Sequence, residues 1–373
     1  MASGLKTIIS DKKTNKMDYS FLLVVFALLS YGLIMVFSAS SATAHYQYGD
    51  AYYFVKRQFI WAVIGVIIMF FVSRISIKTI YKYAIHLMAV SIVLLIAVLF
   101  IGIEVKGAKR WLGFGSFSFQ PSEIAKFAVI VFLARSLTTN KDALKTFSKG
   151  FVPYVLIIGM LAGLVFLEPH FSGAMVIALT GFVVMWAAGA KFAHFAAIAG
   201  AVIPVVGIAM VSASYRLARV TTFLDPFKDT SGDGWQIVQS LYAIGSGGFF
   251  GLGLGQSRQK FLYLPEPQND FIFSIVCEEL GFIGALMVIA LFILLIWKGI
   301  KIAISAPDKF SSLVVIGIIA LIAIQAIFNI AVVTSSIPAT GMPLPFFSYG
   351  GTSLVFILAE MGVVLSISRE CEN

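Results

Sequence analysis

Three carboxylates lie where a polar, proline-rich segment meets a long apolar run. Asp270 ends the segment 265–270, and Glu278 and Glu279 are the acidic interruptions of the run 271–297. A helix turns by ~100° per residue. In a helix that starts near Asp270, the side chain of Glu278 therefore lies roughly 80° around the helix axis from Asp270, and Glu279 lies on the opposite side from Asp270. We expect Asp270 at the rim of a bundle, as a general base, and the glutamates deeper, in packing or ion pairs. Asp270 also suits the N-cap of that helix, which is compatible with catalysis.

A basic group precedes the middle of the chain. Lys109 and Arg110 lie beside Trp111, which suits a phosphate group at the headgroup level of a membrane with the ring as an anchor. The alternative is an interfacial anchor without a ligand.

Polar residues follow at helical spacing. Gln120, Glu123 and Lys126 lie at i, i+3 and i+6 of a helix that Pro121 opens, so they share one side. An ionisable residue within a membrane span is costly and indicates function by default. A purely structural pair of Glu123 with Lys126 is the alternative.

The connection 212–270 is far longer than most loops, and loops of this size are usually functional. Arg216, Arg219, Arg258 and Lys260 bracket its glycine-rich stretch with positive charge. Those glycines resemble a nucleotide-binding loop only superficially, because no strand precedes them and no Lys-Ser or Lys-Thr pair follows. We expect a flexible or re-entrant segment that packs closely on the membrane face.

The elements that position these residues are membrane spans. The 373-residue chain is 59% hydrophobic and only 12% charged, whereas a soluble protein is about 25% charged. The first apolar run follows a basic start without a clear cleavage site, so we expect a retained anchor. We predict one all-α membrane domain over 1–373 with ten transmembrane helices of about 20 residues. They lie near 18–38, 59–73, 84–103, 121–135, 151–167, 171–188, 193–211, 271–297, 312–333 and 347–367.

The distribution of Lys and Arg predicts the orientation. Of the 27 Lys and Arg residues, 16 lie in the segments that are cytoplasmic if the N terminus is cytoplasmic, and ten lie in the outside connections. Both termini, including the tail 1–17, are therefore expected inside a plasma membrane, and 212–270 forms a large extracytoplasmic loop between spans 7 and 8. No basic stripe interleaved with aromatics is present, which argues against nucleic acid as a partner.

An outward-facing site limits the chemistry, since no nucleotide supply is assumed there. A group-transfer enzyme then needs a substrate that is already activated, and a lipid-linked pyrophosphate sugar fits. One carboxylate would deprotonate the attacking hydroxyl, and cations would neutralise the departing pyrophosphate. The candidate cations are Lys109, Arg110, Lys126, Arg216 and Arg219. Gln120, Glu123 and Lys260 complete the expected set of substrate-binding residues. A divalent cation, Mg²⁺ or Mn²⁺, could assist, but no ligand cluster demands one.

Four segments resemble the hallmark segments of the SEDS family (shape, elongation, division, sporulation): "GLIMVFSAS" (32–40), "GAKRWLGFGSFSFQPSEIAK" (107–126), "YLPEPQNDFIFSIVCEELGF" (263–282) and "PATGMPLPFFSYGGTS" (338–353). The resemblance implies a peptidoglycan glycosyltransferase that polymerises lipid II, the undecaprenyl-pyrophosphate-linked disaccharide peptide, with a class B penicillin-binding protein as transpeptidase partner. It also implies that Asp270 is the essential aspartate and that Glu123 and Lys126 are the polar pair of the fourth span.

Within that family, residues 332–353 are similar to the division and sporulation branch, FtsW and SpoVE. Three positions depart from the family pattern: Gln268-Asn269 before the aspartate, Ser335-Ser336 near the end of the ninth span, and His170 after Glu168-Pro169. The last departure puts in doubt a shared acidic role at that turn.

Two other classes of function remain open. In a lipid II flippase, Glu123, Lys126, Glu278 and Glu279 would line a polar path across the bilayer. In a scaffold that recruits the transpeptidase, Asp270 would have no role. Polar groups crowd the outer half of the predicted bundle, which favours the polymerase over the flippase.

Overall fold

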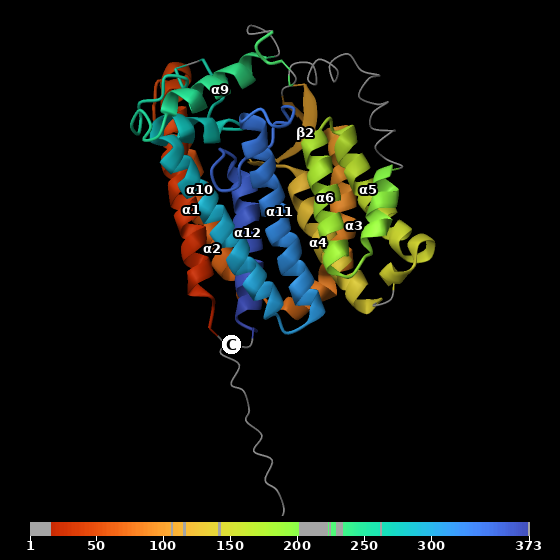
Figure 1. The fold of residues 1–373 in the computed structure, drawn as a ribbon. Coiled ribbons are helices and arrows are strands. Elements are labelled where there is room, and N and C mark those ends of the chain that lie inside the picture. Colours follow the sequence, from red (N-terminus) through yellow and green to blue (C-terminus); the bar gives the residue numbers. More distant parts are fainter. Residues whose placement is uncertain are drawn as a thin grey trace, which may run out of the picture.

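The computed structural model describes residues 16–105, 107–114, 117–140, 143–200, 223, 225–228, 234–261 and 263–371. Within these residues the chain is mostly helical, and the long helices pack side by side as a bundle (Figure 1). One end of the bundle carries a short sheet and α9, and we call it the sheet end. The C terminus lies at the opposite end (Figure 1).

The long helices match the predicted spans in order. They are α1 (Tyr19–Tyr48), α2 (Tyr53–Val72), α3 (Ile77–Ile101), α4 (Pro121–Thr139), α5 (Val152–Leu167), α6 (Phe171–Ala187), α10 (Ile272–Ile304), α11 (Lys309–Val333) and α12 (Gly351–Ser368). Of the seventh predicted span, residues 193–200 are helical, and 201–211 lie outside the described residues. In the part of the chain that the structure describes, seven helical stretches are long and apolar enough to cross a membrane: α1, α2, α3, Phe147–Leu167, α10, α11 and α12.

Several short elements were not predicted. A three-stranded antiparallel sheet of β1 (Ile103–Val105), β2 (Ala108–Phe114) and β3 (Phe117–Phe119) connects α3 to α4, in the order β1-β2-β3. A 3₁₀ turn, η1 (Ala143–Lys145), and a π-helical turn, η2 (Phe147–Phe151), precede α5, and α9 (Trp235–Gly247) precedes α10. The fold is therefore helical with one small sheet at the sheet end.

The core of the bundle is built around α4, α11 and α12. The apolar windows of α11 and α12 are 61% and 72% buried, against 22% for α2 and 28% for α3, which present their remaining side chains outward. Most of α4 is buried, Glu123 and Lys126 included. Ionisable groups in a membrane-embedded bundle face its interior, which is the arrangement seen here.

Small residues bring the helices close, as is usual where lipid supplies no hydrophobic drive between them. A Cβ on Gly362 of α12 would lie 2.5 Å from the carbonyl oxygen of Met69 in α2. A Cβ on Gly32 of α1 would lie 2.2 Å from the carbonyl oxygen of Phe346. The first contact joins α12 to α2, and the second presses the irregular segment 334–350 onto α1.

Helix α10 is broken near its sheet end. It has 33 residues, and Gly281 within it has φ 65° and ψ −161°, which only glycine adopts readily. The backbone groups freed by the break bond to the loop that follows α9: Phe282 N–H donates to the Gly248 carbonyl at 2.9 Å, and Gly253 N–H donates to the Glu279 carbonyl at 2.9 Å. The loop thus satisfies polar groups that a low-dielectric surrounding would penalise.

Two glycines of α9 provide a matched test of this close packing. A Cβ on Gly247 would lie 1.9 Å from the carbonyl oxygen of Cys277 in α10, whereas a Cβ on Gly245 would meet nothing within 4 Å. Gly247→Ala should therefore destabilise the protein by ~1–3 kcal/mol through overpacking. Gly245→Ala should stabilise it by up to ~1 kcal/mol, because alanine is the better helix former. Thermal unfolding of both purified variants checks this, and equal shifts would contradict the packing of α9 on α10.

Candidate active site

A cavity of about 220 Å³ opens among the candidate residues. Its lining comes from distant parts of the chain: β2, the first turns of α4, the turn before α6 with the first turns of α6, the end of the loop before α10, one residue of α11, the irregular segment 334–350 and the first turns of α12. The sequence candidates that line it are Arg110, Gln120, Glu123, Lys126 and Asp270. Residues predicted from separate motifs therefore meet in one place.

Asp270 is held by its backbone. The Nδ2 of Asn329, on α11, donates to the carbonyl oxygens of Asp270 and of Met342, both at 2.7 Å. The neighbouring carbonyl of Asn269 accepts from Ser348 Oγ at 2.7 Å. These bonds fasten the end of the long loop to α11 and to the segment 334–350, so the position of Asp270 is fixed by parts of the chain far from it in sequence.

The carboxylate of Asp270 faces a glycine. A Cβ on Gly341 would lie 3.3 Å from Asp270 Oδ2, and Gly341 has φ +66°. A side chain there would be strained and would crowd the carboxylate. The N-cap of α10 is Phe271, so the N-cap interpretation of Asp270 was wrong by one residue.

Glu123 and Lys126 form an ion pair in the wall of the cavity. Lys126 Nζ lies 2.8 Å from Glu123 Oε1, and the two side chains are 6% and 9% exposed. Both line the same cavity as Asp270. A buried ion pair contributes little net stability, because removing two charges from water costs about as much free energy as their attraction returns. The position of the pair in the cavity wall instead suits contact with a charged ligand.

Arg110 joins the sheet to the turn between α5 and α6. Its Nε donates to the carbonyl of Glu168 at 3.1 Å, and its Nη2 donates to the carbonyl of Pro169. His170 lies in the same turn, with its Nδ1 3.1 Å from Nε2 of Gln120, the N-cap residue of α4. Desolvation of the ring, with help from Arg110 and Lys126, lowers the pKa of His170 to about 3, so this imidazole is neutral at physiological pH.

Two predicted basic residues lie elsewhere. Lys109 is exposed and is absent from the cavity lining; successive side chains of a strand point to opposite faces, so β2 directs Arg110 and Lys109 apart. Lys260 is buried, with Nζ 3.0 Å from Glu279 Oε1. The expected ion-pair role of Glu279 is thus present. Arg216 and Arg219 lie outside the described residues.

The described residues offer little for a resident metal ion. Among them, no three His, Cys, Asp or Glu side chains gather as ligands would. The cavity combines one aspartate, one ion pair and one arginine, an arrangement suited to proton abstraction beside a phosphate-bearing substrate.

The comparison with protein families shows which family this chain belongs to. A family model, FTSW_RODA_SPOVE, described as cell cycle protein, matches residues 19–373. The chain belongs to this family. The SEDS resemblance read from the sequence is thereby confirmed.

Individual family members cover nearly the whole chain. It is 46% identical to stage V sporulation protein E of Bacillus subtilis, over 96% of this chain and 99% of that relative. It is 42% identical to the probable peptidoglycan glycosyltransferase FtsW of Trichlorobacter lovleyi, over 94% of this chain and 93% of that protein.

Solved structures of the family share the fold. A chain from a structure described as structural coordination of polymerization and crosslinking by a peptidoglycan synthase complex has a TM-score of 0.80 at 29% identity, with 95% of this chain and 98% of that chain covered. The crystal structure of the rod shape determining protein RodA of Thermus thermophilus has a TM-score of 0.69 at 25% identity, over 96% and 98%.

Sequence reasoning missed several residues of this family member's cavity. Gln325 lines it, and Asn329, one turn further along α11, fastens Asp270. The two amides at i and i+4 in an otherwise apolar span were the available signal, since polar side chains within a span rarely occur without a partner. Ser172 and Tyr349 also line the cavity and carried no comparable signal.

Glu168, beside Arg110, predicts a pH dependence of stability. Burial raises the pKa of its carboxyl from 4.5 to about 8, although the Arg110 guanidinium lowers it in part. The folded protein therefore holds a proton at this site between about pH 4.5 and 8 that the unfolded chain releases, so the free energy of unfolding falls as pH rises through this window.

Glu168→Gln should remove that loss, because the amide stays neutral. We expect the melting temperature of the parent to drop more between pH 5 and pH 9 than that of the variant, as measured by thermal unfolding in detergent. If the melting temperatures of the parent and the variant change equally between pH 5 and pH 9, Glu168 is ionised in the folded protein over this whole range, which would contradict the prediction.

Proposed function

We propose that this protein is a peptidoglycan glycosyltransferase that polymerises lipid II at the outer face of the cytoplasmic membrane, in cell division or sporulation. The observation that carries the proposal is one cavity that joins the Asp270 carboxylate to Arg110 and Lys126. Relatives named peptidoglycan glycosyltransferase FtsW and stage V sporulation protein E support it.

The proposed reaction is an inverting transfer. Asp270 accepts the proton of the 4-hydroxyl of the N-acetylglucosamine on an incoming lipid II. The hydroxyl oxygen then forms a bond to the anomeric carbon at the lipid-linked end of the growing chain, and the bond from that carbon to the pyrophosphate oxygen breaks. The electron pair leaves with the pyrophosphate, and the proton passes from Asp270 to water.

Cations would stabilise the departing pyrophosphate. Arg110 and Lys126 are the candidates that line the cavity, with Gln120 and Glu123 beside them. Lys109, Arg216 and Arg219 also remain proposed substrate-binding residues, whereas Lys260, which the sequence suggested as a fourth, is buried in an ion pair with Glu279. We propose that any Mg²⁺ or Mn²⁺ arrives on the pyrophosphate oxygens rather than as a resident ion.

The proposed partner is a class B penicillin-binding protein, which would cross-link the strands that this protein makes. The similar chain from a peptidoglycan synthase complex, described for coordinated polymerization and crosslinking, supports this pairing. A flippase or a non-catalytic scaffold remains the competing function, and neither requires the carboxylate of Asp270 to accept a proton.

The proposed topology is one domain over 1–373 with ten spans, both termini in the cytoplasm and 212–270 outside. Glu266 at the sheet end and Ser305 at the opposite end are both exposed, and the two native cysteines are buried. A membrane-impermeant maleimide added to intact cells should therefore label Glu266→Cys and leave Ser305→Cys unlabelled until the membrane is permeabilised. If Ser305→Cys is labelled in intact cells and Glu266→Cys is not, the protein has the opposite orientation in the membrane and the proposed topology is wrong.

The general-base role predicts the effect of Asp270→Asn. The amide has nearly the same size and removes the proton acceptor, so the rate of lipid II polymerisation by the reconstituted protein should fall by ~10²–10⁴. Membrane insertion should be unchanged. The control is Asp50→Asn, an exposed carboxylate that pairs with Lys56 at 2.8 Å and should keep the parent rate.

The same assay separates the alternatives. It is run with and without the penicillin-binding partner, and with EDTA or added Mg²⁺ or Mn²⁺. Polymerisation by Asp270→Asn at the parent rate would refute the chemistry, and loss of activity in EDTA that Mg²⁺ or Mn²⁺ restores would support the ion on the pyrophosphate. A parent protein that moves lipid II across vesicles without making polymer would favour the flippase.

A further inference from the structure

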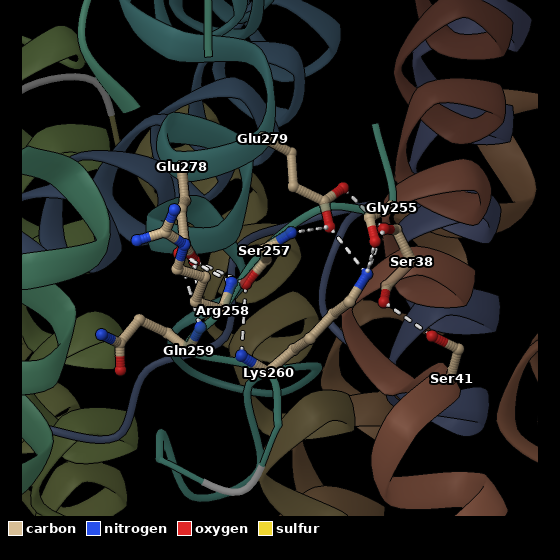
Figure 2. Close-up of polar contacts among 9 residues, drawn as sticks. All are labelled: Ser38, Ser41, Gly255, Ser257, Arg258, Gln259, Lys260, Glu278 and Glu279. Atoms are coloured by element: carbon tan, nitrogen blue, oxygen red, sulfur yellow. Dashed lines mark hydrogen bonds and ion pairs between the residues drawn. The ribbon is translucent and has the colours of Figure 1, made fainter. Parts of the chain in front are cut away.

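A second cluster of buried charges lies at the sheet end, outside the cavity lining (Figure 2). Figure 2 shows Glu278 and Glu279 pointing from α10 toward the loop segment 255–260, with Ser38 of α1 beside Glu279. Lys260 and the two glutamates are 0–3% exposed. We call Ser38, Ser257, Lys260, Glu278 and Glu279 the loop cluster.

Each carboxylate of the loop cluster has several donors. Glu279 accepts from Lys260 Nζ at 3.0 Å and from Ser38 Oγ at 2.5 Å. Glu278 accepts from the hydroxyl of Ser257 and from the backbone N–H of Arg258 at 2.8 Å. Lys260 Nζ also donates to the Gly255 carbonyl at 2.6 Å. The charges are therefore compensated by groups from three separate parts of the chain.

Holding a loop with buried charges carries a large desolvation cost. Apolar side chains of similar volume can replace a buried ion pair without loss of stability, and the attested gain from buried polar groups is a unique arrangement of the chain. Here the arrangement is reinforced by backbone bonds, because Leu252 N–H and Gly253 N–H donate to the carbonyls of Glu278 and Glu279 themselves. The loop cluster thus sets the register of the loop against the broken start of α10.

Asp270 lies within the stretch of chain whose two ends the loop cluster holds together. The loop cluster joins residues 257–260 to residues 278–279, and Asp270 lies between them in sequence. The chain from 257 to 279 is therefore a closed loop, and closure removes conformational freedom from the residues inside it. On one side of Asp270 runs the segment 261–269, where Leu264 N–H donates to the Gln259 carbonyl at 2.9 Å; on the other run the first turns of α10.

We propose that the loop cluster is a positioning element for the reaction: by closing this loop, the Lys260–Glu279 pair and its partners determine where the Asp270 carboxylate lies in the cavity. This inference rests on the proposed function, because it assigns Asp270 as the base. It gives Lys260 an indirect role in place of direct contact with substrate.

The test compares charge removal with charge balance. Lys260→Met and Glu279→Gln each leave one buried charge without its partner, so both should lower thermal stability. The double variant Lys260→Met/Glu279→Gln removes both charges of the pair, so the net charge of the loop cluster is that of the parent, and it should regain the stability of the parent. If the loop cluster positions Asp270, kcat of the double variant should still be about 10-fold to 10²-fold below the parent with KM unchanged, since small misplacement of a reacting group is costly.

Two controls sharpen this comparison. Lys260→Arg keeps the charge and should retain most of kcat. The double variant Lys56→Met/Asp50→Asn removes an exposed ion pair at the sheet end and should leave kcat unchanged. A Lys260→Met/Glu279→Gln protein that regains kcat together with stability would show that the loop cluster only supports the fold, and would overturn the proposal.

A distance measurement decides the same question without activity. Spin labels at Glu266→Cys and Tyr46→Cys, both exposed, would report the position of the 261–269 segment relative to α1, with Cys277 and Cys371 replaced by alanine. The distance distribution should broaden in the Lys260→Met/Glu279→Gln background. An unchanged distribution would overturn the positioning role, whereas a parent that makes no polymer would instead reject the proposed function.

Discussion

The carboxamide of Asn329 is the contact on which the candidate site depends. Its two N–H groups bond to the carbonyls of Asp270 and Met342, at 2.7 Å each, and so join two irregular segments to the middle of the bundle. Irregular backbone is tolerated at membrane depth only where protein or a water-lined cavity satisfies it. Here both segments contribute to the lining of the cavity, together with β2 and the ends of α4, α6, α11 and α12 that face it.

The sequence revealed the charged members of the site and could not reveal how the chain brings them together. Glu123, Lys126 and Asp270 stand out because charge within or beside an apolar run is costly, and all three line the cavity. Lys109 and Lys260 looked equivalent to them by composition. The placement of Lys109 depends on the alternation of side chains along β2, and that of Lys260 on its ion pair with Glu279, 19 residues further along the chain. Neither cause is visible in a count of charges. The long helices among the described residues could be predicted because an apolar run of sufficient length has few alternatives. The break in α10 could not, because it depends on contacts with the loop after α9.

Two of the departures from the family pattern, His170 and Asn269, lie in the cavity lining, and neither replaces a residue to which the proposed chemistry is assigned. His170 stands where relatives were expected to carry an acidic residue, and in this structure it is a neutral partner of Gln120 beside Arg110. Gln268 and Asn269 precede Asp270 and are bonded through their carbonyls to Tyr349 and Ser348. A bond to a backbone carbonyl does not depend on the side chain of the accepting residue, so these two positions can change without loss of the contact.

The order of these contacts along the chain bears on how the protein is made. The loop at 248–253 leaves the ribosome before α10, so the partner of the break at Gly281 is already present when α10 emerges. Asn329, Gly341 and Ser348 follow later, and domains form from the N terminus during synthesis. A nascent chain that has inserted through α10 therefore carries Asp270 without the residues that fasten it. The site is completed only when the last two helices have entered the membrane, and an unfinished chain cannot assemble the cavity.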